Sequence, residues 1–117
     1  MTKNIENYIV KTEQMVWHPL TENEVQYDGV FVKSLHFDTE KQRSTTILIK
    51  FKKGSSYPYH NHPAGEELFV LEGEVIIEGA LLKSGDYLYT PPNCKHSVRT
   101  EIGCTILLIV PKEVEIL

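Results

Sequence analysis

The sequence predicts an all-β protein that folds as a single antiparallel sandwich or small barrel. Residues that favour strands (Val, Ile, Thr, Tyr, Phe and Trp) number 40 of 117, whereas Ala, the strongest helix former, occurs only twice. Short strand-like runs also recur at close intervals, separated by Gly, Pro or Asn, without a helical segment between them. A chain of 117 residues has the length of one domain.

The predicted strands follow one another from residue 30 to residue 110. They cover residues 30–37, 45–51, 57–62, 66–72, 74–78, 80–82, 86–90, 96–100 and 104–110. Before them, polar and apolar residues alternate over 8–17, which is consistent with an edge strand. We therefore expect residues 1–16 to form an N-terminal extension or an edge strand, and residues 17–117 to form the domain.

Two of the predicted strands are apolar on both faces. Residues 68–71 and 106–110 contain no polar side chain at alternate positions, so each face of these strands should be covered. Because the sequence predicts no helices that could cover the outer face, a second subunit is the simplest cover. We therefore predict a homodimer.

Charge and cysteine content exclude several functional classes. The net charge is −4, without the basic surface that nucleic-acid binding needs, and no apolar run approaches the ~20 residues of a membrane span. The first residues lack the apolar core of a secretory signal. The two cysteines, Cys94 and Cys104, are then expected to be reduced thiols in a cytoplasmic protein, whose partner is a small molecule.

Three of the five histidines fall in a pattern typical of a metal site. His60 and His62 are two residues apart on a predicted strand, so both side chains face the same way. Glu66 opens the next strand with a carboxylate, and His96 follows a separate Pro-rich turn. Three imidazoles and one carboxylate that converge inside a barrel suit a divalent transition metal. We expect these four residues to be its ligands.

The residues between these ligands sharpen the prediction. Gly54, His60, His62, Glu66 and Gly73 have the spacing of the first cupin motif, and Gly85, Pro91 and His96 have that of the second. The chain therefore resembles the cupin superfamily, with motifs at 54–73 and 85–100. The resemblance implies a double-stranded β-helix, also called a jelly-roll barrel. Two positions depart from the usual pattern: Asn93 replaces a Gly that favours positive φ, and Thr100 replaces an Asn.

A closer resemblance exists within that superfamily. Residues 17–19, 29–33, 57–67 and 103–106 are similar to the cupin domain of ChrR-type anti-sigma factors and to small diketone-cleaving and aromatic-ketone dioxygenases. ChrR-type regulators also carry an N-terminal zinc-binding segment, which is not expected here because residues 1–16 contain neither Cys nor His. The resemblance implies a metal-dependent dioxygenase acting on a small diketone- or hydroxyketone-like substrate, or a non-catalytic zinc-binding sensory module. A sugar- or acid-processing isomerase is a third alternative.

Imidazole and carboxylate ligands do not select one metal. Fe and Zn are expected first, and Mn, Ni or Cu also suit this ligand set. No catalytic residue beyond the metal ligands is evident. The other conspicuous residues are expected to have structural roles or to be exposed. Cys94 is expected to be a bystander thiol or a fifth ligand, and Cys104 to lie in the core. His18 and His36 are expected at the surface, Glu67 is expected to point outward, and the core or a pocket wall is expected to contain Tyr57, Tyr59, Tyr87 and Tyr89.

Overall fold

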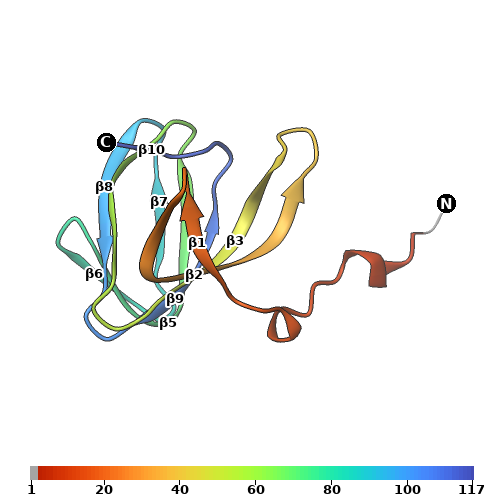
Figure 1. The fold of residues 1–117 in the computed structure, drawn as a ribbon, viewed down its shortest axis with the longest axis horizontal. Helices are drawn as coiled ribbons and strands as arrows, with labels where there is room; N and C mark the ends of the chain where they lie inside the picture. Colours follow the sequence, from red (N-terminus) through yellow and green to blue (C-terminus); the bar gives the residue numbers. More distant parts are fainter. Residues whose placement is uncertain (1–2) are drawn as a thin grey trace.

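The computed structural model describes residues 3–117 and confirms an all-β fold (Figure 1). No α-helix occurs among these residues, and none of their helical segments is long and apolar enough to cross a membrane. Two short 3₁₀ helices precede ten strands. The elements are η1 (Ile5–Tyr8), η2 (Thr12–Gln14), β1 (His18–Glu22), β2 (Val25–Asp38), β3 (Arg43–Phe51), β4 (Ser56–His62), β5 (Glu66–Ile77), β6 (Ala80–Lys83), β7 (Tyr87–Thr90), β8 (Cys94–Arg99), β9 (Cys104–Ile109) and β10 (Glu115–Ile116).

The strands form a curled antiparallel sheet with two sides that share β5. The first side has the order β1-β2-β3-β9-β5-β7, and the second contains β6-β5-β8-β4-β10. Strand β5 has a bulge between Val70 and Glu72 and passes from one side to the other after Gly73. Gly73 follows with φ of +76°, and a Cβ at this position would lie only 2.0 Å from the Gly103 carbonyl oxygen. Glycine is therefore required where β5 bends.

The core lies between the two sides of the curled sheet. Alternate residues of each strand point inward, and the most deeply buried apolar side chains are Val30, Leu68, Val70, Val75 and Ile106. The same alternation places His60, His62, Glu66 and His96 on the inner surface, where all four are buried. The fold thus builds one interior with an apolar part and a polar part.

The structure differs from the prediction at both ends and at one strand. Residues 8–17 form no strand; instead this segment contains η2 and joins η1, whose first turn is capped by the Asn4 side chain. The predicted strands 66–72 and 74–78 are one continuous strand, because Gly73 bends β5 without ending it.

Strands β1 and β10 were not predicted. The tight turn between β1 and β2 uses Asn23 and Glu24, with φ of +50° and +66°, in place of the Asn-Gly pair that usually marks such a hairpin. Strand β10 consists of only two residues, which pair with β4 at Asn61 and His60. A strand this short has no periodicity that a sequence could reveal.

Candidate metal centre

Two neighbouring strands and the start of a third bring the four predicted ligands together. His60 and His62 lie on β4, and His96 on β8 is the direct ladder partner of His60. Glu66 is the first residue of β5, after a turn in which the Gly65 N–H donates to the His62 carbonyl, 3.1 Å away. The antiparallel register of β4 and β8 therefore sets the histidines against one another.

The three histidines form a compact group. Each offers a ring nitrogen, and these three atoms all lie within 4.8 Å of one another, so the group could hold one metal ion. The Glu66 carboxylate oxygens lie 3.5 Å from Nε2 of His62 and 3.9 Å from Nε2 of His96. Glu66 is thus next to two of the three imidazoles, whereas the group within 4.8 Å contains only the three histidines.

Backbone carbonyls fix the orientation of two of these rings. Nδ1 of His60 donates to the Pro58 carbonyl oxygen at 2.6 Å, and Nδ1 of His62 donates to the Cys94 carbonyl oxygen at 2.7 Å. A carbonyl only accepts hydrogen bonds, so each Nδ1 carries the proton and each Nε2 is left with a lone pair. Such outer hydrogen bonds are typical of histidines that bind metals, because they fix the tautomer and the ring orientation.

Burial keeps the imidazoles neutral. Desolvation lowers the pKa of His96 to about 3 and that of His60 to about 4, and it lowers the pKa of His62 as well. Neutral imidazoles can bind a metal at neutral pH. Burial has the opposite effect on the nearby acid and raises the pKa of Glu66 to about 8. A cation beside Glu66 would favour its ionised form.

The residues fit a divalent transition metal. Nε2 of His62 is buried and has no hydrogen-bond partner within the described part of the chain, although buried polar atoms are nearly always paired. The donor set of three imidazole nitrogens and an adjacent carboxylate is one that first-row transition metals accept. A bound metal would satisfy the unpaired nitrogen. That Glu66 is a fourth ligand stays a prediction.

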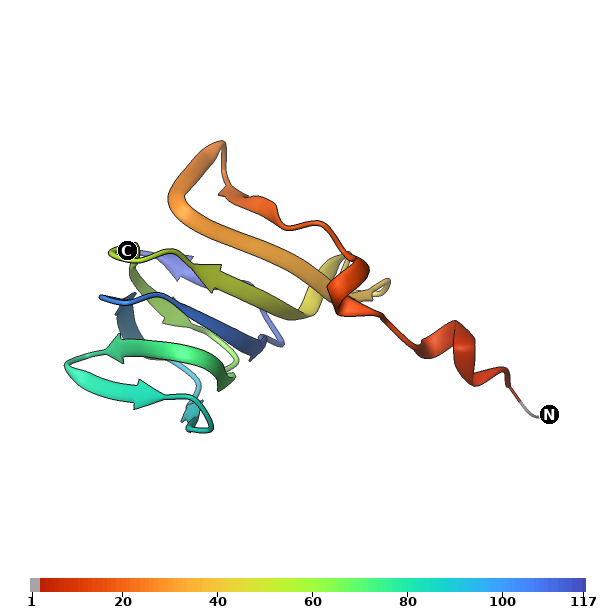
Figure 2. The same cartoon turned by 90° about the horizontal axis from the view of Figure 1, so that it is seen from below.

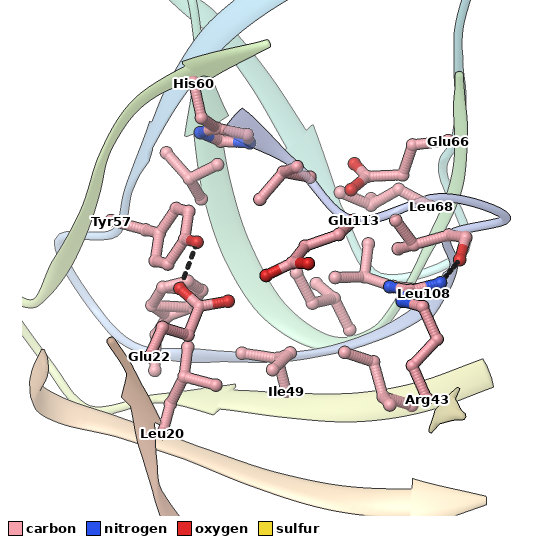
Figure 3. Close-up of a pocket in the computed structure, with 16 residues that line it drawn as sticks. Leu20, Glu22, Arg43, Ile49, Tyr57, His60, Glu66, Leu68, Leu108 and Glu113 are labelled. Atoms are coloured by element: carbon pink, nitrogen blue, oxygen red, sulfur yellow. Dashed lines mark hydrogen bonds between the residues drawn. The ribbon is translucent and has the colours of Figure 1, made fainter. Parts of the chain in front are cut away.

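An apolar cavity leads from this group into the barrel (Figure 3). It has about 640 Å³ of empty space, its open side included, and His60 and Glu66 line one part of it. Most of the wall is aliphatic or aromatic and comes from Leu20, Ile47, Ile49, Phe51, Leu68, Val98, Ile106, Leu108, Val110 and Val114. A mainly apolar lining with a few polar groups is typical of a site for a small organic ligand.

Four polar side chains line the cavity besides the predicted ligands. The Tyr57 hydroxyl donates a hydrogen bond to the Glu22 carboxylate on one wall, and Arg43 donates to the Val110 carbonyl oxygen on another (Figure 3). Glu113 extends between them from the segment that leads to β10. Sequence reasoning singled out only Tyr57, as a core or wall residue. Glu22, Arg43 and Glu113 come from distant parts of the chain, and no local motif marks them.

Most of the other conspicuous residues take the roles expected of them, but three tyrosines do not. Cys104 is buried, Cys94 is exposed, and both are free thiols. Asn93 adopts φ of +64°, as its place in the motif required. The Thr100 hydroxyl donates to the Glu74 carbonyl oxygen at 2.6 Å. His18, His36 and Glu67 are exposed, as expected. Tyr59, Tyr87 and Tyr89 are exposed as well, so the prediction that they lie in the core or at a pocket wall was wrong, and only Tyr57 lines the cavity. Tyr87 and Tyr89 point outward because they pair with Phe69 and Glu67, which are on the outer face of β5.

Residues 6–111 match the family described as the ChrR cupin-like domain, and the chain belongs to that family. Among curated proteins, the chain is 35% identical over 65 residues to the DNA damage-repair/toleration protein DRT102 of Arabidopsis thaliana. It is 38% identical over 65 residues to the uncharacterized protein YdbB of Bacillus subtilis (strain 168). Each match covers 50% of this chain, but only 21% of the plant protein and 58% of the bacterial one.

Solved structures with the same fold include two from the acetylacetone dioxygenase group. A candidate acetylacetone dioxygenase from Methylibium petroleiphilum PM1 superposes with a TM-score of 0.82 at 19% identity, covering 100% of this chain and 85% of that one. An acetylacetone dioxygenase from Acinetobacter johnsonii gives a TM-score of 0.74 at 17% identity, with 93% and 74% covered. These similarities confirm the cupin fold that the two motifs predicted.

Proposed function

We propose that this ChrR cupin-like chain is a metal-dependent enzyme of the dioxygenase type, acting on a small diketone- or hydroxyketone-like substrate. The observation that carries the proposal is the position of two residues that line the apolar cavity: His60, which belongs to the three-histidine group, and Glu66, which lies beside that group. A ligand in the cavity would therefore lie beside the metal. The fold shared with acetylacetone dioxygenases supports the reaction class.

The protein's part in this function is to hold one cation and expose it to the cavity. His60, His62 and His96 would bind it through nitrogens, and Glu66 would supply a negatively charged oxygen. Once bound, a metal such as Fe or Zn, or alternatively Mn, Ni or Cu, supplies a Lewis acid and, when redox-active, electron transfer for oxygen chemistry. Three or four protein ligands leave positions free on a six-coordinate ion.

The lining of the cavity would determine which substrates bind. Its aliphatic wall favours a compact apolar body and excludes water around it. The Tyr57 hydroxyl and its acceptor Glu22 form a polar pair on that wall, where they can accept a hydrogen bond from an enol or hydroxyl group of the ligand. A small molecule with two oxygens on a short carbon chain matches this combination of an apolar wall and few polar groups.

A second candidate function shares the same site. The family match favours a zinc-binding sensory module, in which the cavity binds an effector and no reaction follows. The two functions differ in the metal they need and in whether oxygen is consumed. Metal identity and oxygen uptake therefore separate them.

The first experiment measures metal content after purification from the native host. We expect about one divalent transition metal per chain, and at least a tenfold lower content in His62→Gln. His36→Gln is the matched control, because His36 is exposed and lies outside the cluster. Metal content that is the same in both variants would rule out the site.

The second experiment tests catalysis with acetylacetone as the probe. Anaerobically prepared, Fe(II)-loaded protein should consume oxygen when acetylacetone is added, and His96→Gln should abolish the consumption. Tight zinc binding in the native host, without oxygen uptake by the iron form on any diketone or hydroxyketone, would favour the sensory module instead.

A further inference from the structure

Arg43 is the only lysine or arginine that lines the apolar cavity in the part of the chain that the structure describes. It is the first residue of β3 and is partly buried. Its guanidinium donates one hydrogen bond, to the Val110 carbonyl oxygen, and none of the ion pairs among the described residues includes it. The cavity therefore contains a positive charge that has no anionic partner and still has N–H donors to offer.

The strand register places Arg43 at the same end of the barrel as the candidate metal centre. Thr46 on β3 pairs with Ile109 on β9, and Ile109 pairs with Glu67 on β5. Arg43 and Glu66 are therefore separated by two strand spacings across the sheet and by two residues along it, or ~12 Å between their backbones. Both side chains extend into the cavity (Figure 3), so a ligand of a few carbons can contact both.

The other charged groups of the cavity limit which anion fits beside Arg43. Glu22 accepts a hydrogen bond from Tyr57 on the opposite wall, and Glu113 extends between that wall and Arg43 (Figure 3). Two carboxylates near a single guanidinium repel a dianion such as phosphate. A singly charged carboxylate is repelled less, and its two oxygens match the planar donor fork of a guanidinium. The charges therefore favour a ligand with one carboxylate on an apolar body.

We propose that Arg43 binds a carboxylate of the ligand, and that the substrate is therefore a small oxo acid rather than a neutral diketone. The inference rests on the proposed function, because it takes the cavity beside the metal centre as the ligand site. The carboxylate would lie at Arg43, and the keto or enol oxygens would face the end of the cavity lined by His60 and Glu66. A neutral diketone would leave the guanidinium without a counter-ion. The molecule also offers a view of this end of the chain in which the N-terminal residues run away from the barrel and leave the cavity to the strands (Figure 2).

Two ligands that differ only in the carboxylate test the inference. Acetylpyruvate has the carbon skeleton of acetylacetone with a carboxylate in place of one terminal methyl group. Calorimetric titration of the zinc-loaded protein measures both affinities without any reaction. The wild-type chain should bind acetylpyruvate at least tenfold more tightly than acetylacetone, and Arg43→Gln should lower this ratio of affinities at least tenfold. A wild type that binds both equally, or a ratio that survives in Arg43→Gln, would overturn the inference.

Lys41→Gln is the matched control. The Lys41 side chain donates to the Pro111 carbonyl oxygen at 2.8 Å, next to the carbonyl that Arg43 contacts, but Lys41 is exposed and does not line the cavity. This variant should keep the wild-type ratio of affinities. An equal loss in both variants would show that the two side chains only hold the segment after β9 in place, and it would overturn the inference.

Glu113→Gln tests the same charge with Arg43 intact, and so remains informative if Arg43→Gln does not fold. Removal of a negative charge beside the ligand carboxylate should raise the ratio of affinities at least twofold. An unchanged ratio would place the carboxylate away from this part of the cavity and overturn the inference.

Competition with inorganic phosphate tests the selection of a carboxylate. Phosphate at the same concentration should not displace acetylpyruvate, and displacement would show a general anion site and overturn the inference. Oxygen uptake by the Fe(II)-loaded protein reports separately on the proposed function. A preference for acetylpyruvate without oxygen uptake would support the role of Arg43 and reject the dioxygenase, whereas oxygen uptake without that preference would do the opposite.

Discussion

The two faces of strand β5 depart in opposite ways from the usual distribution of polar and apolar residues. Its inner face carries Glu66, a carboxyl group that is only 5% exposed, ahead of the core residues Leu68 and Val70. Its outer face carries Phe69 and Leu71, two large apolar side chains that are partly exposed to water. Successive residues of one strand thus place a polar group inside and apolar groups outside.

Both departures are unfavourable in an isolated chain. A buried carboxyl resists ionisation, and exposed apolar surface lacks the free energy of burial. A cation on the inner face would offset the first, and a protein surface packed on the outer face would offset the second. A buried carboxyl group and exposed apolar side chains on one strand can therefore each indicate a separate binding site.

Truncation of neighbouring side chains on β5 should give the largest difference between the two faces. Leu68→Ala removes a fully buried side chain and should lower the free energy of unfolding by about 2–5 kcal/mol. Phe69→Ala, the next residue along, should lower it by less than about 1 kcal/mol under conditions where the protein is monomeric. Urea denaturation at low protein concentration measures both. Equal losses would show that the outer face of β5 is part of the core.

Glu66→Gln should have opposite effects on metal affinity and on metal-free stability. Burial raises the pKa of Glu66 to about 8, from 4.5 in the unfolded chain. The folded state therefore holds the proton more tightly, and this stabilisation is complete below pH 4.5 and is lost as the pH rises through 8. Gln has no such dependence, so the variant should gain stability relative to wild type between pH 5 and 9.

The measurement uses urea denaturation of chelator-treated protein at pH 5 and pH 9, together with metal titration at pH 7. Metal affinity should fall at least tenfold in Glu66→Gln. Glu67→Gln is the control, because Glu67 is the exposed neighbour on the outer face, and neither quantity should change by a comparable amount. If the free energy of unfolding depended on pH in the same way in both variants, Glu66 would not be the group responsible for that dependence.

Two tyrosines that hydrogen-bond to glutamates should give the smallest difference. Tyr57 donates to Glu22 inside the cavity, and Tyr87 donates to Glu67 on the outer face at 2.7 Å. Tyr57→Phe should lower the free energy of unfolding by about 1–2 kcal/mol, because it leaves Glu22 without its donor on the cavity wall. Tyr87→Phe should change it by less than about 0.5 kcal/mol, because water replaces the lost partner. Thermal and urea unfolding measure both variants. Equal losses in the free energy of unfolding would show that the cavity wall is as solvated as the surface.

Much of the fold could be predicted because it rests on local signals. The strand-rich composition gave the all-β class, and the Gly, Pro and His spacings identified the cupin frame that the family match confirms. Asn93 was expected to adopt positive φ, which it does. The errors lie where local signals are weak. The alternation over residues 8–17 resembles a strand, but in the described structure this segment contains a 3₁₀ turn and no strand partner pairs with it.

The candidate metal site was more predictable than the cavity beside it. Metal ligands must be particular residue types at particular spacings, so His60, His62, Glu66 and His96 could be named from the sequence, and the structure brings them close together. The cavity has no such constraint. Its polar members Glu22, Arg43 and Glu113 lie on β1, on β3 and before β10, and only the closure of the barrel makes them neighbours.

The sequence by itself determined the class of fold and the residue types available to hold a metal, because strand propensity, turn chemistry and ligand spacing act over a few residues. Only the tertiary structure decided which carbonyls orient the histidines, how far burial shifts the pKa values of His60, His96 and Glu66, and which apolar side chains of β5 remain uncovered. Those properties depend on desolvation and on contacts between strands far apart in the chain, and no local pattern encodes them.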